Sequence, residues 1–219
     1  MLFDEDGFVG LPRGGFELFS IPQREPRRRR ILETIHPPLK LLGERLVRGL
    51  GRKLPQRLHA HLPQLNWPPG YQPFCTWLAL SYEAHGYQEG PQLNLGVHAD
   101  HVSVRLGWDT RPDLFGRFEF LCRFGGLDRQ LVDLCGGFGL KVRVYASARW
   151  PQGSRLTFES ATEIGRSFDE VRRRGVWWEI GYRFELPQRI EEVSSAEFAD
   201  RSFELFSLLC PLYDRVAKH

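Results

Sequence analysis

Two alternating stretches separated by a two-residue turn constrain the fold of this chain most. Residues 92–98 and 101–108 place apolar residues at alternate positions, which is the period of a strand with one buried face. A turn at residues 99–100 fixes the register, because a shift by one residue would move every apolar side chain to the other face. The predicted apolar pairs are Val97 with Val102, Leu95 with Val104 and Leu93 with Leu106, and the polar pairs are His98 with His101, Gly96 with Ser103 and Asn94 with Arg105.

The other patterns add strands and helices around this hairpin. Further strands are predicted at residues 75–82, 140–145, 155–159 and 176–186. Helices are predicted at residues 26–35, 37–49, 113–135 with a break at Gly125 and Gly126, 162–174, and from Ser194 onward. We therefore expect a two-layer α+β fold with a mainly antiparallel sheet of about five to six strands, and with helices packed on one face and at both chain ends.

The composition is typical of one soluble domain. The 219 residues are 42% hydrophobic and 26% charged, so the chain can bury a core without disulfides or a structural metal. We expect one domain over residues 1–219, with a loosely ordered N-terminal segment at residues 1–14. A formal net charge of +3 does not indicate a nucleic-acid partner. The apolar runs are far shorter than the ~20 residues that cross a bilayer, so we expect a cytoplasmic protein without a membrane partner.

Cysteines and arginines both have simple structural interpretations. A run of four arginines at Arg27–Arg30 suits phosphate or an anionic membrane, but four consecutive helical residues point in four directions and equally form a solvated helix face. The cysteines are widely spaced, lie beside apolar residues and are predicted to be buried free thiols: Cys75, Cys122, Cys135 and Cys210.

No specific catalytic or cofactor motif stands out. Glycines at 136, 137 and 139 follow a helix and precede a strand, which is the reverse of a dinucleotide-binding loop. His98, Asp100 and His101 at the hairpin tip have the ligand types of a transition-metal site. An ordinary polar hairpin end, or a pH-sensitive or ligand-contacting histidine pair, explains them as well. We therefore predict no cofactor and no metal.

The polar faces of the strands together offer a candidate ligand site. Arginines interleaved with glutamate, tyrosine and tryptophan suit bidentate binding of a carboxylate or phosphate, although a sheet face that meets water has the same pattern. The candidate residues are Asn94, His98, His101, Arg105, Arg143, Tyr145, Arg155, Glu159, Trp177, Glu179 and Arg183.

Three functional hypotheses remain open from this face. The first is a protein that binds a small anionic or polar ligand, or a protein partner. The second is an enzyme that uses Glu159 or Glu179 as general base, with His98 or His101 nearby. The third is a purely structural or interaction protein.

Six short stretches, in order along the chain, match one known family. They are Gly15–Pro22 (GFELFSIP), Ile31–Gly43 (ILETIHPPLKLLG), Pro68 and Pro69 with Trp77, Gly86–Pro91 (GYQEGP), Leu95–Val104 and Leu208–Tyr213 (LLCPLY). In them the chain resembles the YktB family of small bacterial proteins, a domain of unknown function. The resemblance implies a two-layer α+β domain similar in topology to the catalytic sheet of class II synthetases and biotin ligases. It implies no activity.

The chain departs from the family pattern at two places. The resemblance implies paired arginines before the Pro-Pro turn and a later Arg-Gly-Tyr-Lys motif. This chain has Leu62–Leu65 (LPQL) and His85–Gln88 (HGYQ) there. Basic residues that could hold an anion are therefore missing at these positions.

Overall fold

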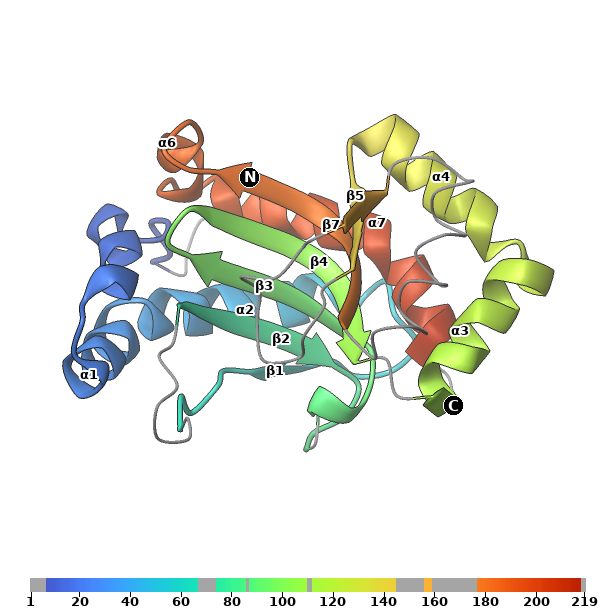
Figure 1. The fold of residues 1–219 in the computed structure, drawn as a ribbon, viewed down its shortest axis with the longest axis horizontal. Coiled ribbons are helices and arrows are strands. Elements are labelled where there is room, and N and C mark those ends of the chain that lie inside the picture. The colour runs from blue at the N-terminus through green and yellow to red at the C-terminus, as the bar shows by residue number, and fades with distance from the viewer. Residues whose placement is uncertain are drawn as a thin grey trace.

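The computed structural model describes residues 7–66, 74–85, 87–109, 112–144, 156–158 and 177–217. Within these residues seven strands form one antiparallel sheet in the order β1-β2-β3-β4-β7-β5-β6 (Figure 1). The strands are β1 (His59–His61), β2 (Cys75–Ser81), β3 (Gln92–His98), β4 (His101–Asp109), β5 (Lys141–Val144), β6 (Leu156–Phe158) and β7 (Trp177–Glu185). The predicted α+β class with a mainly antiparallel sheet is confirmed.

Helices precede, interrupt and follow the strands. The α-helices are α1 (Arg24–Thr34), α2 (His36–Leu50), α3 (Pro112–Gly125), α4 (Leu127–Phe138), α6 (Ile190–Val193) and α7 (Phe198–Ala217), and the 3-10 helices are η1 (Arg13–Ser20) and η2 (Tyr87–Glu89). Gly126 separates α3 from α4 with a φ of 69°, in the left-handed region that glycine adopts readily. The break predicted at Gly125 and Gly126 is therefore confirmed.

The hairpin has the predicted register. β3 and β4 pair Val97 with Val102, and Asn94 with Arg105. β2 extends the apolar rows on one side, and β7 extends them on the other by pairing with β4. The two-residue turn and the alternation together determined this register, because alternation excludes a shift by one residue and the short turn excludes larger shifts.

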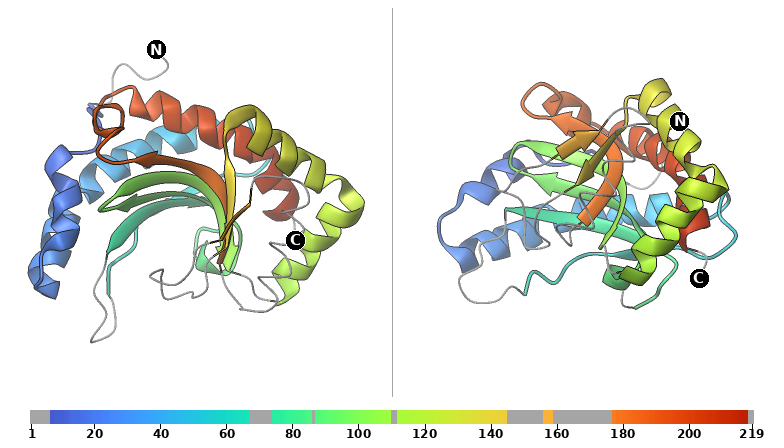
Figure 2. Two further views of the ribbon diagram at one scale, coloured as in Figure 1. Left: turned by 45° about the horizontal axis from the view of Figure 1, so that its top comes forward. Right: turned by 45° about the vertical axis from the view of Figure 1, so that its right-hand side comes forward.

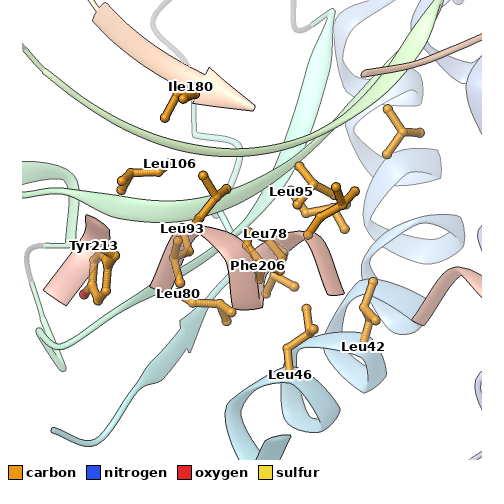
Figure 3. Close-up of a cluster of buried hydrophobic side chains, with 14 of the residues drawn as sticks. Leu42, Leu46, Leu78, Leu80, Leu93, Leu95, Leu106, Ile180, Phe206 and Tyr213 are labelled. Carbon is orange, nitrogen blue, oxygen red and sulfur yellow. The ribbon is translucent and has the colours of Figure 1, made fainter. Parts of the chain in front are cut away.

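The apolar face of the sheet packs against α2 and α7. The sheet is curved, and both helices lie on its convex side (Figure 2). Leucines of α2, β2, β3 and β4 meet Phe206 and Tyr213 of α7 in one buried cluster (Figure 3). We call the opposite, concave side of the sheet the polar face. The labelled core residues are Leu42, Leu46, Leu78, Leu80, Leu93, Leu95, Leu106, Ile180, Phe206 and Tyr213.

Several predicted elements differ from the structure in detail. β1 was not predicted, because three residues are too short to give a recognisable period. Helix α7 begins at Phe198, since Ser194 instead ends α6 with its amide bonded to Ile190 O at 3.0 Å. In the predicted loose N-terminal segment, Phe8 and Leu11 are buried. The helix predicted at 162–174 lies outside the described residues.

Candidate functional site

Asn94 and Arg105 lie at the centre of a buried polar cluster. Arg105 Nε and Nη2 donate to Asn94 Oδ1 at 3.2 and 3.1 Å, and Arg105 Nη1 donates to Glu179 Oε2 at 2.9 Å. Asn94 Nδ2 donates to Gln92 Oε1 at 3.0 Å. Trp177 Nε1 donates to the same Glu179 oxygen at 3.2 Å. We call these five residues the charged network.

Burial makes the charged network a closed unit. Glu179 is fully buried, and only 3% of Arg105 is exposed. A buried ion pair is tolerated when hydrogen bonds compensate the lost hydration, as they do here. The interpretation in which these side chains simply meet water is therefore wrong. The role of general base for Glu179 also loses support, because two donors stabilise its ionised form and hold it in place.

Gly107 determines where the Trp177 ring lies. A Cβ atom at Gly107 would come within 2.9 Å of the Trp177 Nε1 and Cζ2 atoms. The indole therefore lies directly on the backbone of β4, at a position that only glycine leaves open. This contact and the bond to Glu179 together fix the ring.

Arg143 and Arg183 lie on the same face with other neighbours. Arg143 Nη1 donates to Gly181 O at 3.2 Å and to Lys141 O at 3.4 Å, so its guanidinium stabilises backbone on β5 and β7. Arg183 is the register partner of Ser103. Backbone carbonyls thus accept hydrogen bonds from Arg143, whereas the Glu179 carboxylate accepts from Arg105.

His98 and His101 form a buried stacked pair. Their ring centroids are 4.0 Å apart with an interplanar angle of 13°. His101 Nδ1 donates to Asp100 Oδ1 at 2.6 Å. Burial lowers the pKa of His101 to about 4, and Arg183 acts in the same direction while Asp100 opposes it. Burial also holds the pKa of His98 well below its usual range, so both rings are neutral at pH 7.

A hollow of about 670 Å³ opens at the β1–β2 end of the polar face. The segment that follows β1 and the segment around η2 bound it, and both lie beside β2 (Figure 1). Its described lining residues are Ala60, His61, Leu62, Pro63, Gln64, Leu65, Asn66, Trp77, Ala84, His85, Tyr87 and Gln88.

Leu65 and Arg28 shape one wall of the hollow. Leu65 has a φ of 55°, a value that residues other than glycine and asparagine rarely adopt. The Leu65 side chain is buried. Arg28 Nε donates to Leu65 O at 3.2 Å, and Arg28 Nη2 donates to Gln64 O at 3.4 Å and Asn66 Oδ1 at 3.2 Å. One arginine of α1 therefore holds three consecutive residues of the wall. We call this contact the Arg28 clamp.

The first two arginines of the run at Arg27–Arg30 donate hydrogen bonds to backbone carbonyls of the fold. Arg27 is buried, and its Nε atom donates to Ile21 O at 2.6 Å, while Arg28 forms the clamp. Arg29 and Arg30 are exposed, as a solvated helix face predicts. The four arginines thus point in different directions, as their spacing indicated.

The predicted site residues divide between these clusters. Asn94, Arg105, Trp177 and Glu179 join the charged network, and His98 and His101 form the stacked pair. Arg143 and Arg183 lie beside them. The predicted residues Tyr145, Arg155 and Glu159 lie outside the described part of the chain. None of the eight described candidates lines the hollow.

Sequence reasoning missed the residues of the hollow. Trp77 lies in a predicted strand, Tyr87 lies in the unpredicted η2, and His61 lies in the unpredicted β1. One signal pointed there. The two stretches at which the chain departs from the YktB pattern both contribute lining residues, Leu62–Leu65 from one and His85, Tyr87 and Gln88 from the other.

Other site types find no support in the described residues. In that part of the chain no three His, Cys, Asp or Glu side chains are grouped so that they could hold a metal ion. Nor does any described helix have the length and apolarity to span a membrane. All four cysteines are free and buried, and burial raises the pKa of the Cys75 thiol to about 12. The prediction of buried free thiols is confirmed.

The N-terminal half of the chain has recognisable relatives. Residues 13–112 match the family described as Domain of unknown function (DUF1054). The UPF0637 protein YsbB of Lactococcus lactis is 32% identical over 98 residues, which are 44% of this chain and 49% of the relative. The UPF0637 protein OB1420 of Oceanobacillus iheyensis is 31% identical over 97 residues, which are 44% of this chain and 47% of the relative.

These matches cover only part of either protein. A third relative, the UPF0637 protein lwe1043 of Listeria welshimeri, is 28% identical over 101 residues, which are 46% of this chain and 50% of the relative. The chain thus spans about half the length of the curated relatives it matches. The described lining residues of the hollow all lie within residues 13–112, whereas Glu179 and Trp177 of the charged network do not. Residues 13–112 are thus similar to the DUF1054 family model and to UPF0637 proteins of several bacteria, and five of the six motif stretches lie within this part of the chain.

Proposed function

We propose that this chain binds a small polar ligand in the hollow at the β1–β2 end of the polar face. The proposal keeps the ligand-binding function expected from the polar face and moves the site from the arginines to the sheet edge. The volume of about 670 Å³ suits this function, since small-molecule sites measure roughly 300–1,000 Å³.

The strained wall at Leu65 carries the proposal. A leucine in the left-handed region costs about 1 kcal/mol or more and persists only when the surroundings hold it. Here the buried side chain and the Arg28 clamp hold it. Such strain is common at ligand clamps, because the fold maintains a shape that the backbone would not adopt alone.

The charged network is a weaker candidate for the same function. Its guanidinium and carboxylate groups already bind each other inside the sheet layer. A ligand there would have to displace those contacts and would leave a buried charge uncompensated. The hollow requires no such exchange.

Thermal unfolding with a ligand panel tests the proposal. The panel contains nucleosides, sugars, amino acids, carboxylic acids and phosphorylated metabolites. A ligand at ~100 times its dissociation constant adds about 2.7 kcal/mol to stability, which raises the melting temperature by several degrees. Ala84→Phe fills the hollow from an exposed position, and Ala196→Phe makes the same change at an exposed position outside it.

The two variants decide the outcome. We expect a ligand that stabilises the wild-type chain and Ala196→Phe but not Ala84→Phe. An equal shift in both variants would place the site elsewhere and overturn the proposal. So would a panel in which no compound shifts the wild-type chain.

A further inference from the structure

Among the described residues, the lining of the hollow consists of apolar, aromatic, histidine and amide side chains. None of its described lining residues is a lysine, arginine, aspartate or glutamate. Burial lowers the pKa of His61, so its ring is neutral at pH 7. The nearby Arg28 guanidinium is directed at loop carbonyls and at Asn66. A ligand with a full charge would therefore lose hydration without gaining a countercharge from these residues.

Three linked rings form the aromatic side of the hollow. His61 and Tyr87 stack with centroids 4.6 Å apart and an interplanar angle of 13°. Trp77 Nε1 donates to Tyr87 Oη at 3.3 Å. His61 Nε2 lies 2.9 Å from Glu83 O, and because a carbonyl only accepts, this nitrogen carries the proton. Rings fixed in this way offer rigid π surface, which favours a planar ligand.

Two side-chain amides have complementary hydrogen-bonding capacity left. Gln64 Oε1 accepts from Asn66 Nδ2 at 3.2 Å, which leaves the Gln64 NH₂ group as donor. Gln88 Nε2 donates to Tyr87 Oη at 3.3 Å, which leaves Gln88 Oε1 as acceptor. A donor and an acceptor among the lining residues match a ring whose edge carries both kinds of group.

We propose that the hollow binds an uncharged heteroaromatic ring with hydrogen-bond donors and acceptors on its edge, of which a nucleobase is the common biological example. The inference rests on the proposed function and names its ligand class. The ring stacks against the aromatic side, and its edge contacts Gln64 and Gln88. The base can come from a free nucleoside or from a single-stranded nucleic acid.

Calorimetric titration of the full chain tests the ligand class. The probes are adenosine, guanosine, cytidine and uridine, their 5′-monophosphates, indole, sorbitol and a short single-stranded oligonucleotide. We expect at least one nucleoside to bind, its monophosphate to bind with an affinity within about threefold, and indole to bind about tenfold more weakly because it has no acceptor on its edge. Sorbitol should not bind.

Variants locate the contacts. Gln64→Leu and Gln88→Leu should each weaken nucleoside binding about tenfold, the usual effect of one lost hydrogen bond. Gln23→Leu, at an exposed position immediately before α1, is the matched control and should change nothing. Circular dichroism verifies that each variant is folded.

Each remaining outcome is decisive. Binding of the bases only within the oligonucleotide keeps the ring chemistry and identifies nucleic acid as its source. A monophosphate that binds more than about tenfold tighter than its nucleoside, or preferential binding of sorbitol or indole, overturns the ligand class, while a binding loss in Ala84→Phe still supports the proposed function. If no probe binds and no compound of the thermal panel shifts the wild-type chain, both proposals fail.

Discussion

The two ends of the polar face use opposite solutions to the same physical problem. In the charged network, Arg105 and Glu179 are buried and satisfy each other with two amides and an indole. At the hollow, the walls avoid charge and use rings and amides. A buried charge must keep its partner, so the first end is committed to the fold. Under the proposed function the second end exchanges water for a ligand, because none of its described lining residues forms an ion pair.

The two ends also differ in whether their residues lie within the stretch that matches the family model. The hollow is built within residues 13–112, the part that matches DUF1054. The charged network needs Glu179 and Trp177 from β7 as well.

Removing one partner of the network should have the largest effect on stability. Arg105→Ala leaves the fully buried Glu179 carboxylate without its cation and should lower the free energy of unfolding by about 3–5 kcal/mol. Urea denaturation followed by circular dichroism measures this change. The double variant Arg105→Met with Glu179→Leu should be more stable than either single variant, since it removes both charges together.

A surface ion pair provides the control for this prediction. Arg201 and Glu204 are bonded at 3.0 Å with side chains 39% and 63% exposed, and Arg201 also lies over the Tyr182 ring, so Arg201→Ala should change stability by about 1 kcal/mol. If Arg105→Ala costs no more than Arg201→Ala, the network is not the closed unit described above. If it abolishes binding in the hollow beyond the loss of folded protein, the two ends are not independent.

The stacked histidines should make stability depend on pH. The folded-state pKa values of His98 and His101 lie below the unfolded value of about 6.5. As pH falls, the unfolded chain therefore binds protons first. Their contribution is complete above pH 6.5 and is lost as the pH falls toward the folded-state pKa of His101, about 4.

Phenylalanine variants separate this pair from other histidines. His36 has its pKa lowered to about 4 by burial, so it contributes over the same pH range. The double variant His98→Phe and His101→Phe keeps two stacked rings without the titration, and its unfolding free energy should fall less steeply between pH 6.5 and 5. An unchanged slope in that variant would assign the pH dependence to His36 or to other groups.

Local patterns predicted the fold and half of the polar face. The register from Val97–Val102 to Asn94–Arg105 followed from one hairpin, because the two-residue turn fixes the alignment and the alternation agrees with it. The sequence also placed Glu179 on the correct face of its strand. It did not predict that Glu179 meets Arg105, since that depends on β7 pairing with β4, and strand order is not encoded in periodicity.

The hollow was beyond sequence reasoning for a different reason. Trp77 and Tyr87 have the composition of core residues, and nothing in their spacing indicates that they border an open space. The Arg28 clamp joins residues that are 36 to 38 positions apart, through two backbone carbonyls, which carry no sequence signal, and the Asn66 amide. Contacts to the backbone and the shape between segments can be seen only once the chain is folded.

Loosening the Arg28 clamp should affect binding more than stability, and this contrast with Arg105 separates the two ends most directly. Arg28→Ala removes a partly exposed side chain from the carbonyls of Gln64 and Leu65, so it should cost only about 1 kcal/mol of stability. The wall would then be free to relax from the left-handed conformation at Leu65, and nucleoside binding should weaken about tenfold because the ligand must restore that shape. Arg29→Ala, at the exposed neighbouring position, should change neither quantity in urea denaturation or calorimetry. If Arg28→Ala lowers stability as much as Arg105→Ala and leaves binding intact, the strained wall stabilises the fold and does not shape a ligand site.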